Sequence, residues 1–388
     1  MNNRTIAVFI GTRPEGIKMA PVIKALEAAD GFRPLVISTG QHREMLDQVV
    51  DIFDLRVDED LNVMLPNQSL ATLTARLMER IDAALDKFKP DMALVQGDTT
   101  TVLTASLACF YRRIPVGHVE AGLRTGNLVS PFPEEANRRL AGVLADLHFA
   151  PTSVSRDNLL KEHVDPDAIT VTGNTVIDAL LMEQSRQNTD SAGIRRQIDQ
   201  ALAEHLPGDW RQVPYVLVTG HRRENFGEGF LQICKALAEL ARAFPDHRFI
   251  YPVHLNPNVQ QPVNDILSGI DNIFLIPPQG YRNFVALMAH ARVVLTDSGG
   301  VQEEAPSLAK PVLVMRDTTE RPEGVAAGTV RLVGASAERI VAETSLLLGD
   351  EDAWAEMANA RNPYGDGQAS RRIVAAISDW FEKQTGTS

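Results

Sequence analysis

Polar turns that follow short apolar runs hold the residues of this 388-residue chain that could do chemistry. The clearest turn, residues 296–300 (TDSGG), follows apolar residues 293–295 and precedes a helical pattern that carries Glu303 and Glu304. Glycines let a backbone approach a ligand closely, and the N–H groups at a helix N-terminus attract anions. The turn therefore predicts a phosphate or diphosphate site, with an ordinary turn capped by Ser298 as the alternative.

Basic residues follow the first apolar run of the chain. Arg13 and Lys18 come after residues 6–10, in a turn and in the helical pattern behind it. Because the planar guanidinium of arginine fits phosphate oxygens, contact with an anion is the favoured interpretation. A solvated surface position is the alternative.

Three acidic residues and a histidine occupy similar positions farther along the chain. Asp98 fits either a helix N-cap or a catalytic carboxylate, and Glu120 directly follows a strand, where an unpaired buried carboxylate would be costly. Glu134 lies in the first turn of a predicted helix, which the helix dipole alone would favour. His221 follows a strand next to two arginines, a position that favours a ligand contact or a proton role.

The composition is typical of a soluble globular protein, with a formal net charge of −12. Such a charge argues against a nucleic-acid or anionic membrane partner, so local donors must hold any anionic ligand. Cys109 and Cys234 lie far apart in apolar patterns, which predicts reduced core thiols in a cytoplasmic protein. No targeting signal and no membrane-spanning apolar run is expected.

The elements that must position these residues repeat a strand–helix pattern twice, as in parallel sheets covered on both faces. Helices are predicted, among others, at residues 17–29, 70–88, 193–204 and 229–244. The predicted strands are residues 6–10, 34–38, 92–96, 116–119, 147–150, 169–172, 215–219, 248–253, 273–276, 293–296, 312–315 and 330–333.

A polar stretch at residues 185–213 marks the join between the two halves. We predict an α/β fold with two Rossmann-like, doubly wound domains facing a cleft, comprising residues 1–175 and 176–366. A last helix within residues 367–388 is expected to pack back on the first domain. Ligands of doubly wound sheets bind beyond the carboxyl ends of the strands, where the polar turns lie.

Several other chemistries lack their motifs in the sequence. We find no P-loop, no Gly-x-Gly-x-x-Gly after the first strand and no Gly-x-Ser-x-Gly nucleophile elbow. The histidines and cysteines also lack zinc spacing, so no metal site is predicted. A nicotinamide or flavin dehydrogenase is therefore disfavoured.

Long and unusual strings, in order along nearly the whole chain, resemble the non-hydrolysing UDP-N-acetylglucosamine 2-epimerases of bacteria. They are residues 11–15 (GTRPE), 41–48 (QHREMLDQ), 97–101 (GDTTT), 117–126 (GHVEAGLRTG), 133–138 (PEEANR), 219–224 (TGHRRE), 296–306 (TDSGGVQEEAP), 315–322 (MRDTTERP) and 362–367 (NPYGDG).

The resemblance implies a fold like that of the GT-B glycosyltransferases and a homodimer. It implies interconversion of UDP-N-acetylglucosamine and UDP-N-acetylmannosamine for surface polysaccharides, without a redox cofactor or an obligatory metal. In the family, UDP is eliminated to leave 2-acetamidoglucal and is then added back with C2 inverted.

The matched motifs carry the family's site residues to this sequence. Asp98, Glu120, Glu134 and His221 resemble the catalytic group, with individual roles open. Contacts to the nucleotide sugar are implied for Arg13, Lys18, Gln279, Phe284, Ser298, Gly299, Gly300, Glu304 and Arg321, although Arg321 could simply bridge a loop.

A second UDP-N-acetylglucosamine activates some relatives, and Gln41, Arg43 and Arg222 are compatible with such an allosteric site. Glu44 and Asn67 depart from the residues that activator-dependent relatives often carry, so activation stays open. Three further alternatives also stay open: a GT-B glycosyltransferase, an epimerase of a modified UDP-sugar, and a non-catalytic nucleotide-sugar sensor.

Overall fold

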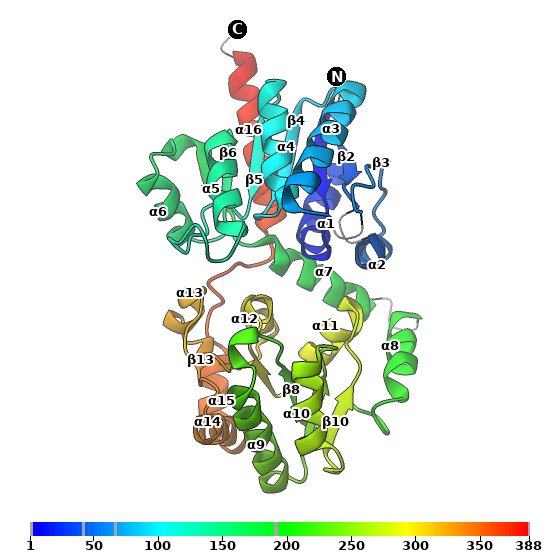
Figure 1. Cartoon of the computed structure of the whole chain (residues 1–388), viewed down its shortest axis with the longest axis vertical. Helices are drawn as coiled ribbons and strands as arrows, with labels where there is room; N and C mark the ends of the chain where they lie inside the picture. Colours follow the sequence, from blue (N-terminus) through cyan, green and yellow to red (C-terminus); the bar gives the residue numbers. More distant parts are fainter. Residues whose placement is uncertain (1–2, 41–42, 66–67, 190–192, 387–388) are drawn as a thin grey trace. The chain divides into compact units, whose positions relative to one another are not determined.

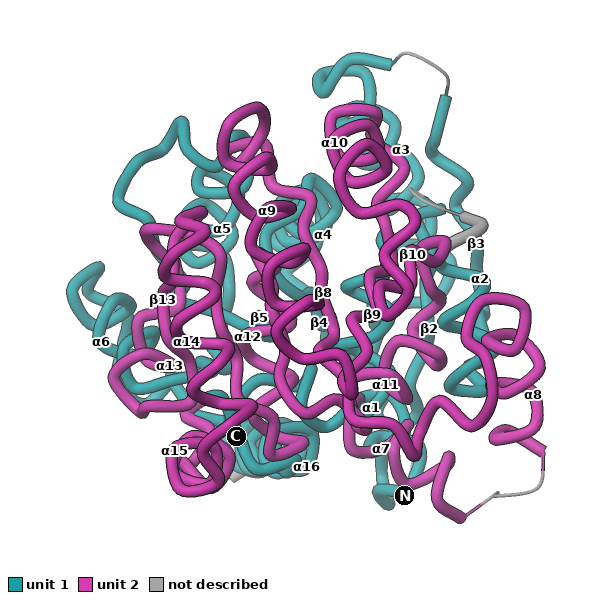
Figure 2. Tube along the Cα trace, turned by 90° about the horizontal axis from the view of Figure 1, so that it is seen from below, with its two compact units in different colours: residues 1–179, 364–388 teal, residues 180–363 magenta. Residues whose placement is uncertain are grey.

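The computed structural model describes residues 3–40, 43–65, 68–189 and 193–386. The chain forms two compact units, which Figure 2 colours separately. Unit 1 comprises residues 1–179 and 364–388, and unit 2 comprises residues 180–363. Each unit has its own apolar core around a parallel sheet, as the repeated strand–helix pattern predicts.

Unit 1 contains a seven-stranded sheet in the order β3-β2-β1-β4-β5-β6-β7. Its strands are β1 Arg4–Ile10, β2 Phe32–Ser38, β3 Glu59–Asp60, β4 Met92–Gln96, β5 Val116–Val119, β6 Leu147–Ala150 and β7 Ile169–Val171. Its helices are α1 Arg13–Ala28, α2 Arg43–Phe53, α3 Leu70–Phe88, α4 Thr100–Tyr111, α5 Glu134–Leu144, α6 Ser153–Lys161 and α16 Ala369–Gly386, and α7 Thr175–Thr189 continues into unit 2 (Figure 1).

Unit 2 contains a six-stranded sheet in the order β10-β9-β8-β11-β12-β13. Its strands are β8 Tyr215–Thr219, β9 Arg248–Pro252, β10 Ile273–Ile276, β11 Val293–Thr296, β12 Val312–Val314 and β13 Val330–Leu332. Its helices are α8 Gly193–Ala203, α9 Glu228–Ala243, α10 Pro257–Leu267, α11 Tyr281–His290, α12 Gly299–Glu304, α13 Pro322–Ala326, α14 Ala337–Gly349 and α15 Glu351–Ala358.

Both sheets reverse their strand order at one place, between β1 and β4 in unit 1 and between β8 and β11 in unit 2. In doubly wound folds such a reversal opens a crevice at the carboxyl ends of the strands. The predicted α/β class of two doubly wound domains is confirmed, and every predicted strand is present with its ends within two residues.

The sequence prediction differed from the structure at two elements. It did not include the short edge strand β3, whose two acidic residues carry no apolar signal. It also began the first helix at residue 17, whereas α1 begins at Arg13. The earlier start has a clear cause: Thr12 and Glu15 form a capping box around the first turn.

The C-terminal helix α16, red in Figure 1, packs on α1 within unit 1. Its N-terminus is bound by Asp178 of α7, whose carboxylate accepts hydrogen bonds from the backbone N–H groups of Ala369 (3.2 Å) and Ser370 (2.8 Å). The rings of Phe32 and Phe381 also meet, with centroids 6.3 Å apart. Among the described helices, none is long and apolar enough to cross a membrane.

Candidate functional site

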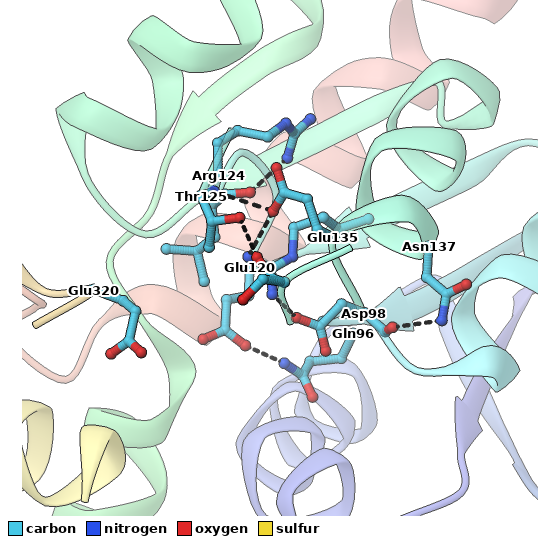
Figure 3. A network of polar contacts seen from close by, with 12 residues as sticks. Gln96, Asp98, Glu120, Arg124, Thr125, Glu135, Asn137 and Glu320 are labelled. Carbon is cyan, nitrogen blue, oxygen red and sulfur yellow. Dashed lines mark hydrogen bonds and ion pairs between the residues drawn. The ribbon is translucent and has the colours of Figure 1, made fainter. Parts of the chain in front are cut away.

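Two of the predicted acidic residues follow neighbouring strands of unit 1. Strands β4 and β5 pair in parallel, with Gln96 opposite Val119 at their carboxyl ends. Asp98 therefore lies beside Glu120, close to the point where the strand order reverses. Figure 3 shows the polar network around these two carboxylates.

Glu120 is a buried carboxylate surrounded by donors. Lys18 Nζ lies 2.7 Å from Oε1 and 2.6 Å from Oε2. Gln96 Nε2 also donates to Oε2, and Asn174 Nδ2 donates to Oε1 at 3.1 Å. The backbone of Glu120 adopts a φ of 63°, a conformation that costs a non-glycine residue about 1–3 kcal/mol. The side-chain network holds the residue in this conformation and aims its carboxylate.

Lys18 was predicted to contact the nucleotide sugar, and the structure places its ammonium group on Glu120. The side chains of both partners are largely buried, with exposed fractions of 16% for Lys18 and 5% for Glu120. A buried pair of this kind loses several kcal/mol if one charge is removed. In this structure, Lys18 positions a predicted catalytic carboxylate.

Asp98 has a different environment from Glu120. The N-cap of α4 is Thr99, whose side chain accepts from Val102 N, so the alternative that Asp98 caps this helix is wrong. The Asp98 carboxylate instead pairs with Arg138 Nη2 at 2.5 Å. Burial raises the pKa of Asp98, and the opposing effect of the Arg138 charge is smaller. Asp98 thus binds a proton more readily than an ordinary aspartate, and the pair with Arg138 fixes its orientation.

The two glutamates at the start of α5 have separate roles. Glu135 is fully buried and accepts from the backbone N–H groups of Thr125 (3.1 Å) and Gly126 (3.2 Å). Its carboxylate also lies 3.4 Å from Arg138. Glu134 is half-buried at the first position of the helix. Glu135 therefore secures the loop before α5, whereas Glu134 is the more exposed of the two glutamates.

A buried histidine supports the turn that carries Asp98. The Nε2 of His118 lies 2.7 Å from the carbonyl oxygen of Gly97, and burial lowers the pKa of His118 to about 4. The neutral imidazole can donate from Nε2 to this carbonyl. His118 therefore has a structural role.

Arg13 is the first residue of α1 and is half-buried. The turn before it is fixed by Glu15, whose Oε2 accepts from the N–H groups of Gly11 (2.9 Å) and Thr12 (2.6 Å). Thr99 donates to the other oxygen at 2.6 Å. The first turn of α1 is thus tied to the loop after β4, which carries Asp98.

In unit 2, His221 and the turn 296–300 follow the paired strands β8 and β11. Asp297, at the start of this turn, is completely buried. Its Oδ2 accepts from the backbone N–H groups of His221 and Arg222, both at 2.8 Å. Its Oδ1 lies 3.3 Å from His221 Nδ1.

The predicted anion turn has the expected strand–turn–helix form. Ser298 occupies the N-cap position of α12 without a side-chain capping bond, so the alternative of a serine-capped turn is not supported. Arg321 Nε pairs with Glu303 Oε1 at 2.6 Å and its guanidinium lies against Gly299, where a Cβ would come within 2.6 Å of Nη1. A larger residue at position 299 would therefore have to displace the Arg321 guanidinium. Glu304 is buried one turn later.

The remaining predicted residues are two sugar-nucleotide contacts in unit 2 and the three residues of the possible allosteric site. Gln279, two residues before α11, and Phe284, in its first turn, are half-buried, and Gln279 donates to the carbonyl of Pro277 at 2.7 Å. Arg222 is half-buried beside His221. Gln41 lies outside the described residues, and for Arg43 only the backbone is described, as part of α2.

Sequence reasoning missed four residues that position the predicted catalytic group: Gln96, Arg138, Asn174 and Asp297. A signal existed for two of them. Gln96 is the polar last residue of an apolar strand, and Asn174 follows the last strand of its sheet. Arg138 and Asp297 required knowledge of which side chains meet in space.

Comparison with known proteins identifies the family. A family model described as UDP-N-acetylglucosamine 2-epimerase matches residues 24–378. The UDP-N-acetylglucosamine 2-epimerase of Yersinia pestis is 58% identical over 97% of this chain and 98% of its own length. The enzyme of the same name from Escherichia coli K12 is 57% identical over 97% of this chain and 98% of its own length.

A crystal structure of UDP-GlcNAc 2-epimerase from Neisseria meningitidis bound to UDP-GlcNAc is also similar. It has a TM-score of 0.86 and 51% identity, and the match covers 97% of this chain and 100% of that one. The chain described here therefore belongs to the UDP-N-acetylglucosamine 2-epimerase family.

Proposed function

We propose that this protein interconverts UDP-N-acetylglucosamine and UDP-N-acetylmannosamine by eliminating UDP and adding it back. The observation that carries the proposal is a pair of carboxylates at adjacent strand ends, the half-buried Asp98 held by Arg138 and the buried Glu120 held by Lys18. Full-length similarity to enzymes named for this reaction supports the choice of substrate.

The chemistry explains why such an arrangement is needed. The C2 proton of the sugar is not adjacent to a carbonyl, so simple deprotonation is unfavourable. In the elimination, the C2–H bond gives its proton to an enzyme base, a C1=C2 bond forms, and the C1–O bond breaks to release UDP. The reverse addition delivers a proton to the opposite face of C2. Stabilisation of the leaving diphosphate and two proton-transfer groups are therefore required.

We assign proton transfer at C2 to Asp98, Glu120 and Glu134. Glu120, with donors on both oxygens, is suited to act as an ionised carboxylate. Burial raises the pKa of Asp98, which suits a group that must give a proton back. His221 is proposed to stabilise the charge on the diphosphate. The nucleotide sugar would contact Arg13, Gln279, Phe284, Ser298, Gly299, Gly300, Glu304 and Arg321.

We further propose a cytoplasmic homodimer. Helices α4 and α5 pack together in unit 1 and expose large apolar side chains, with Tyr111 68% and Val143 83% exposed. Large exposed apolar side chains that gather on neighbouring helices are typical of an association surface. The buried thiols of Cys109 and Cys234 suit a reducing compartment.

Incubation with UDP-N-acetylglucosamine in deuterium oxide tests the reaction. We expect deuterium at C2 of both epimers and accumulation of UDP-N-acetylmannosamine, detected by NMR. An absence of exchange despite bound substrate would favour a glycosyltransferase or a sensor. Epimerisation without deuterium at C2 would overturn the elimination route. A parallel incubation with the corresponding UDP-uronic acid tests the modified-sugar alternative.

A further inference from the structure

We propose that Asp297 is the positioning residue of His221, holding the imidazole with Nδ1–H toward the aspartate and Nε2 toward the ligand. The proposal rests on the proposed function only in that His221 faces the leaving diphosphate. The tautomer itself is a property of unit 2 and can be observed without turnover.

The two oxygens of Asp297 have different partners. Oδ2 accepts from the N–H groups of His221 and Arg222, both at 2.8 Å, and lies 3.4 Å from Asn225 Nδ2. Oδ1 is buried, and within the described part of the chain no group satisfies it with normal hydrogen-bond geometry. The group poised to do so is His221 Nδ1, at 3.3 Å. A small rotation of the imidazole completes the bond and satisfies an otherwise costly oxygen.

The carboxylate cannot easily move to other partners. The backbone N–H of Asp297 donates to the carbonyl of Thr219 at 3.2 Å, which joins β11 to β8. Asn225 Nδ2 also donates to the carbonyl of Met315 at 3.0 Å, next to β12. Because the same carboxylate binds the backbone N–H and faces the ring of His221, it orients that residue as a unit.

Among the described residues, three charged or titratable groups act on the imidazole of His221. Asp297 lies on one side, Arg222 follows in the chain, and the ring of His254 stacks at a centroid distance of 5.6 Å and an angle of 20°. Burial lowers the pKa of His221, the Asp297 charge opposes this, and the Arg222 and His254 charges add to the lowering. Above pH 6.5, the ordinary pKa of histidine, the imidazole is therefore neutral, and the choice between two tautomers matters.

Asp297 decides that choice in favour of Nδ1–H, since only this tautomer donates to Oδ1. Nε2 then carries the lone pair and can receive a proton when an anionic ligand arrives. The resulting imidazolium would lie between two negative charges, the carboxylate and the diphosphate. An aspartate that orients a catalytic histidine in this way is a recurrent arrangement in enzymes.

Nitrogen-15 NMR of the histidine-labelled full chain tests the proposal. The His221 resonances are assigned from their loss in His221→Gln. In the wild-type protein above pH 7.5 we expect a protonated Nδ1 and an unprotonated Nε2. In Asp297→Asn the amide oxygen can keep the backbone bonds while its NH₂ group faces Nδ1, so we expect the opposite tautomer. In that variant kcat should fall about 100-fold or more, with KM changed by less than about threefold.

Asn225→Ala is the matched control, because it loosens the same loop and leaves Oδ1 in place. It should keep the wild-type tautomer. An Nε2–H tautomer in the wild-type protein, or an unchanged tautomer in folded Asp297→Asn, would overturn the proposal. If Asp297→Asn does not fold, the tautomer of His221 in the wild-type protein is enough to support or overturn the proposal. If His221 has the expected tautomer but the protein does not exchange the C2 proton of the substrate, the proposed function is contradicted and the role of Asp297 stands.

Discussion

The ammonium nitrogen of Lys18 lies within 2.7 Å of both carboxylate oxygens of Glu120. The cation comes from the second turn of α1 and the anion from the residue after β5, so the contact joins two sequence-distant elements of unit 1. The sugar-nucleotide contact that the resemblance implies for Lys18 stays a prediction, and the pairing adds a second role, in which Lys18 holds the predicted catalytic carboxylate.

Lys18→Met should therefore reduce kcat at least about tenfold while KM for UDP-N-acetylglucosamine changes little. The substitution keeps the side-chain volume but leaves the Glu120 charge uncompensated, which should also destabilise the protein by about 3–5 kcal/mol. Steady-state kinetics and urea unfolding measure the two effects. Lys24→Met is the control, since its partly exposed pair with Glu27 on the same helix contributes at most about 1 kcal/mol. A raised KM with unchanged kcat would favour the predicted substrate contact over the positioning role.

Arg138→Met should move the acidic limb of the kcat/KM profile to higher pH. Burial raises the pKa of Asp98, and the Arg138 charge partly opposes that rise, so its removal raises the pKa further. A base with a higher pKa is protonated, and inactive, at a higher pH. Arg139→Met, one residue along α5, should keep the wild-type profile because Arg139 pairs with Glu162. An unshifted limb in Arg138→Met would mean that Asp98 does not govern it.

Glu134→Gln and Glu135→Gln should have opposite consequences. The first should lower kcat by about 100-fold or more and leave the unfolding midpoint unchanged, because Glu134 is half-buried and is a proposed proton-transfer group. The second should destabilise the protein by about 1–3 kcal/mol, since a neutral amide weakens the bonds to two backbone N–H groups and Arg138. Kinetics combined with thermal unfolding separates the two outcomes. A stability loss in Glu134→Gln would contradict this division.

His118 and His148 should each lower the stability of the protein as the pH falls from 6.5 toward 4. Burial lowers the pKa values of both His118 and His148 to about 4, below the ordinary value of 6.5. Below pH 6.5 these two histidines therefore bind protons in the unfolded chain but not in the folded chain. Their contribution to the free energy of unfolding is full above pH 6.5 and declines below it.

His118→Gln can keep a donor for the Gly97 carbonyl and removes one titrating group. Its stability loss between pH 7.5 and 4.5 should be smaller than that of the wild-type protein by up to about 3 kcal/mol. Urea unfolding at several pH values measures the difference. An identical pH dependence in this variant would show that His118 does not contribute.

The sequence predicted the strands because apolar runs of four to six residues between polar turns carry a strong signal, as at β4 and β11. It also placed the polar candidate residues, such as Asp98 and His221, just after predicted strands. It could not predict that Lys18 reaches Glu120, or that Asp297 turns inward to His221, because these contacts depend on side-chain directions after packing. The N-cap of α4 was assigned ambiguously for a related reason: Asp98 and Thr99 are both good caps, and only the contact with Arg138 separates them.

Unit 1 is built from two segments, with all of unit 2 between them in the chain. The closing contacts are the bond from Asn174 N to the carbonyl of Tyr364 (2.7 Å) and the capping of α16 by Asp178. During translation, residues 180–363 must leave the ribosome before α16 can reach its place on α1. Domains usually fold as they emerge, so unit 2 can complete its fold while the unit synthesised first still lacks its last helix. Unit 1 would then be the first unit to begin synthesis and the last to be completed.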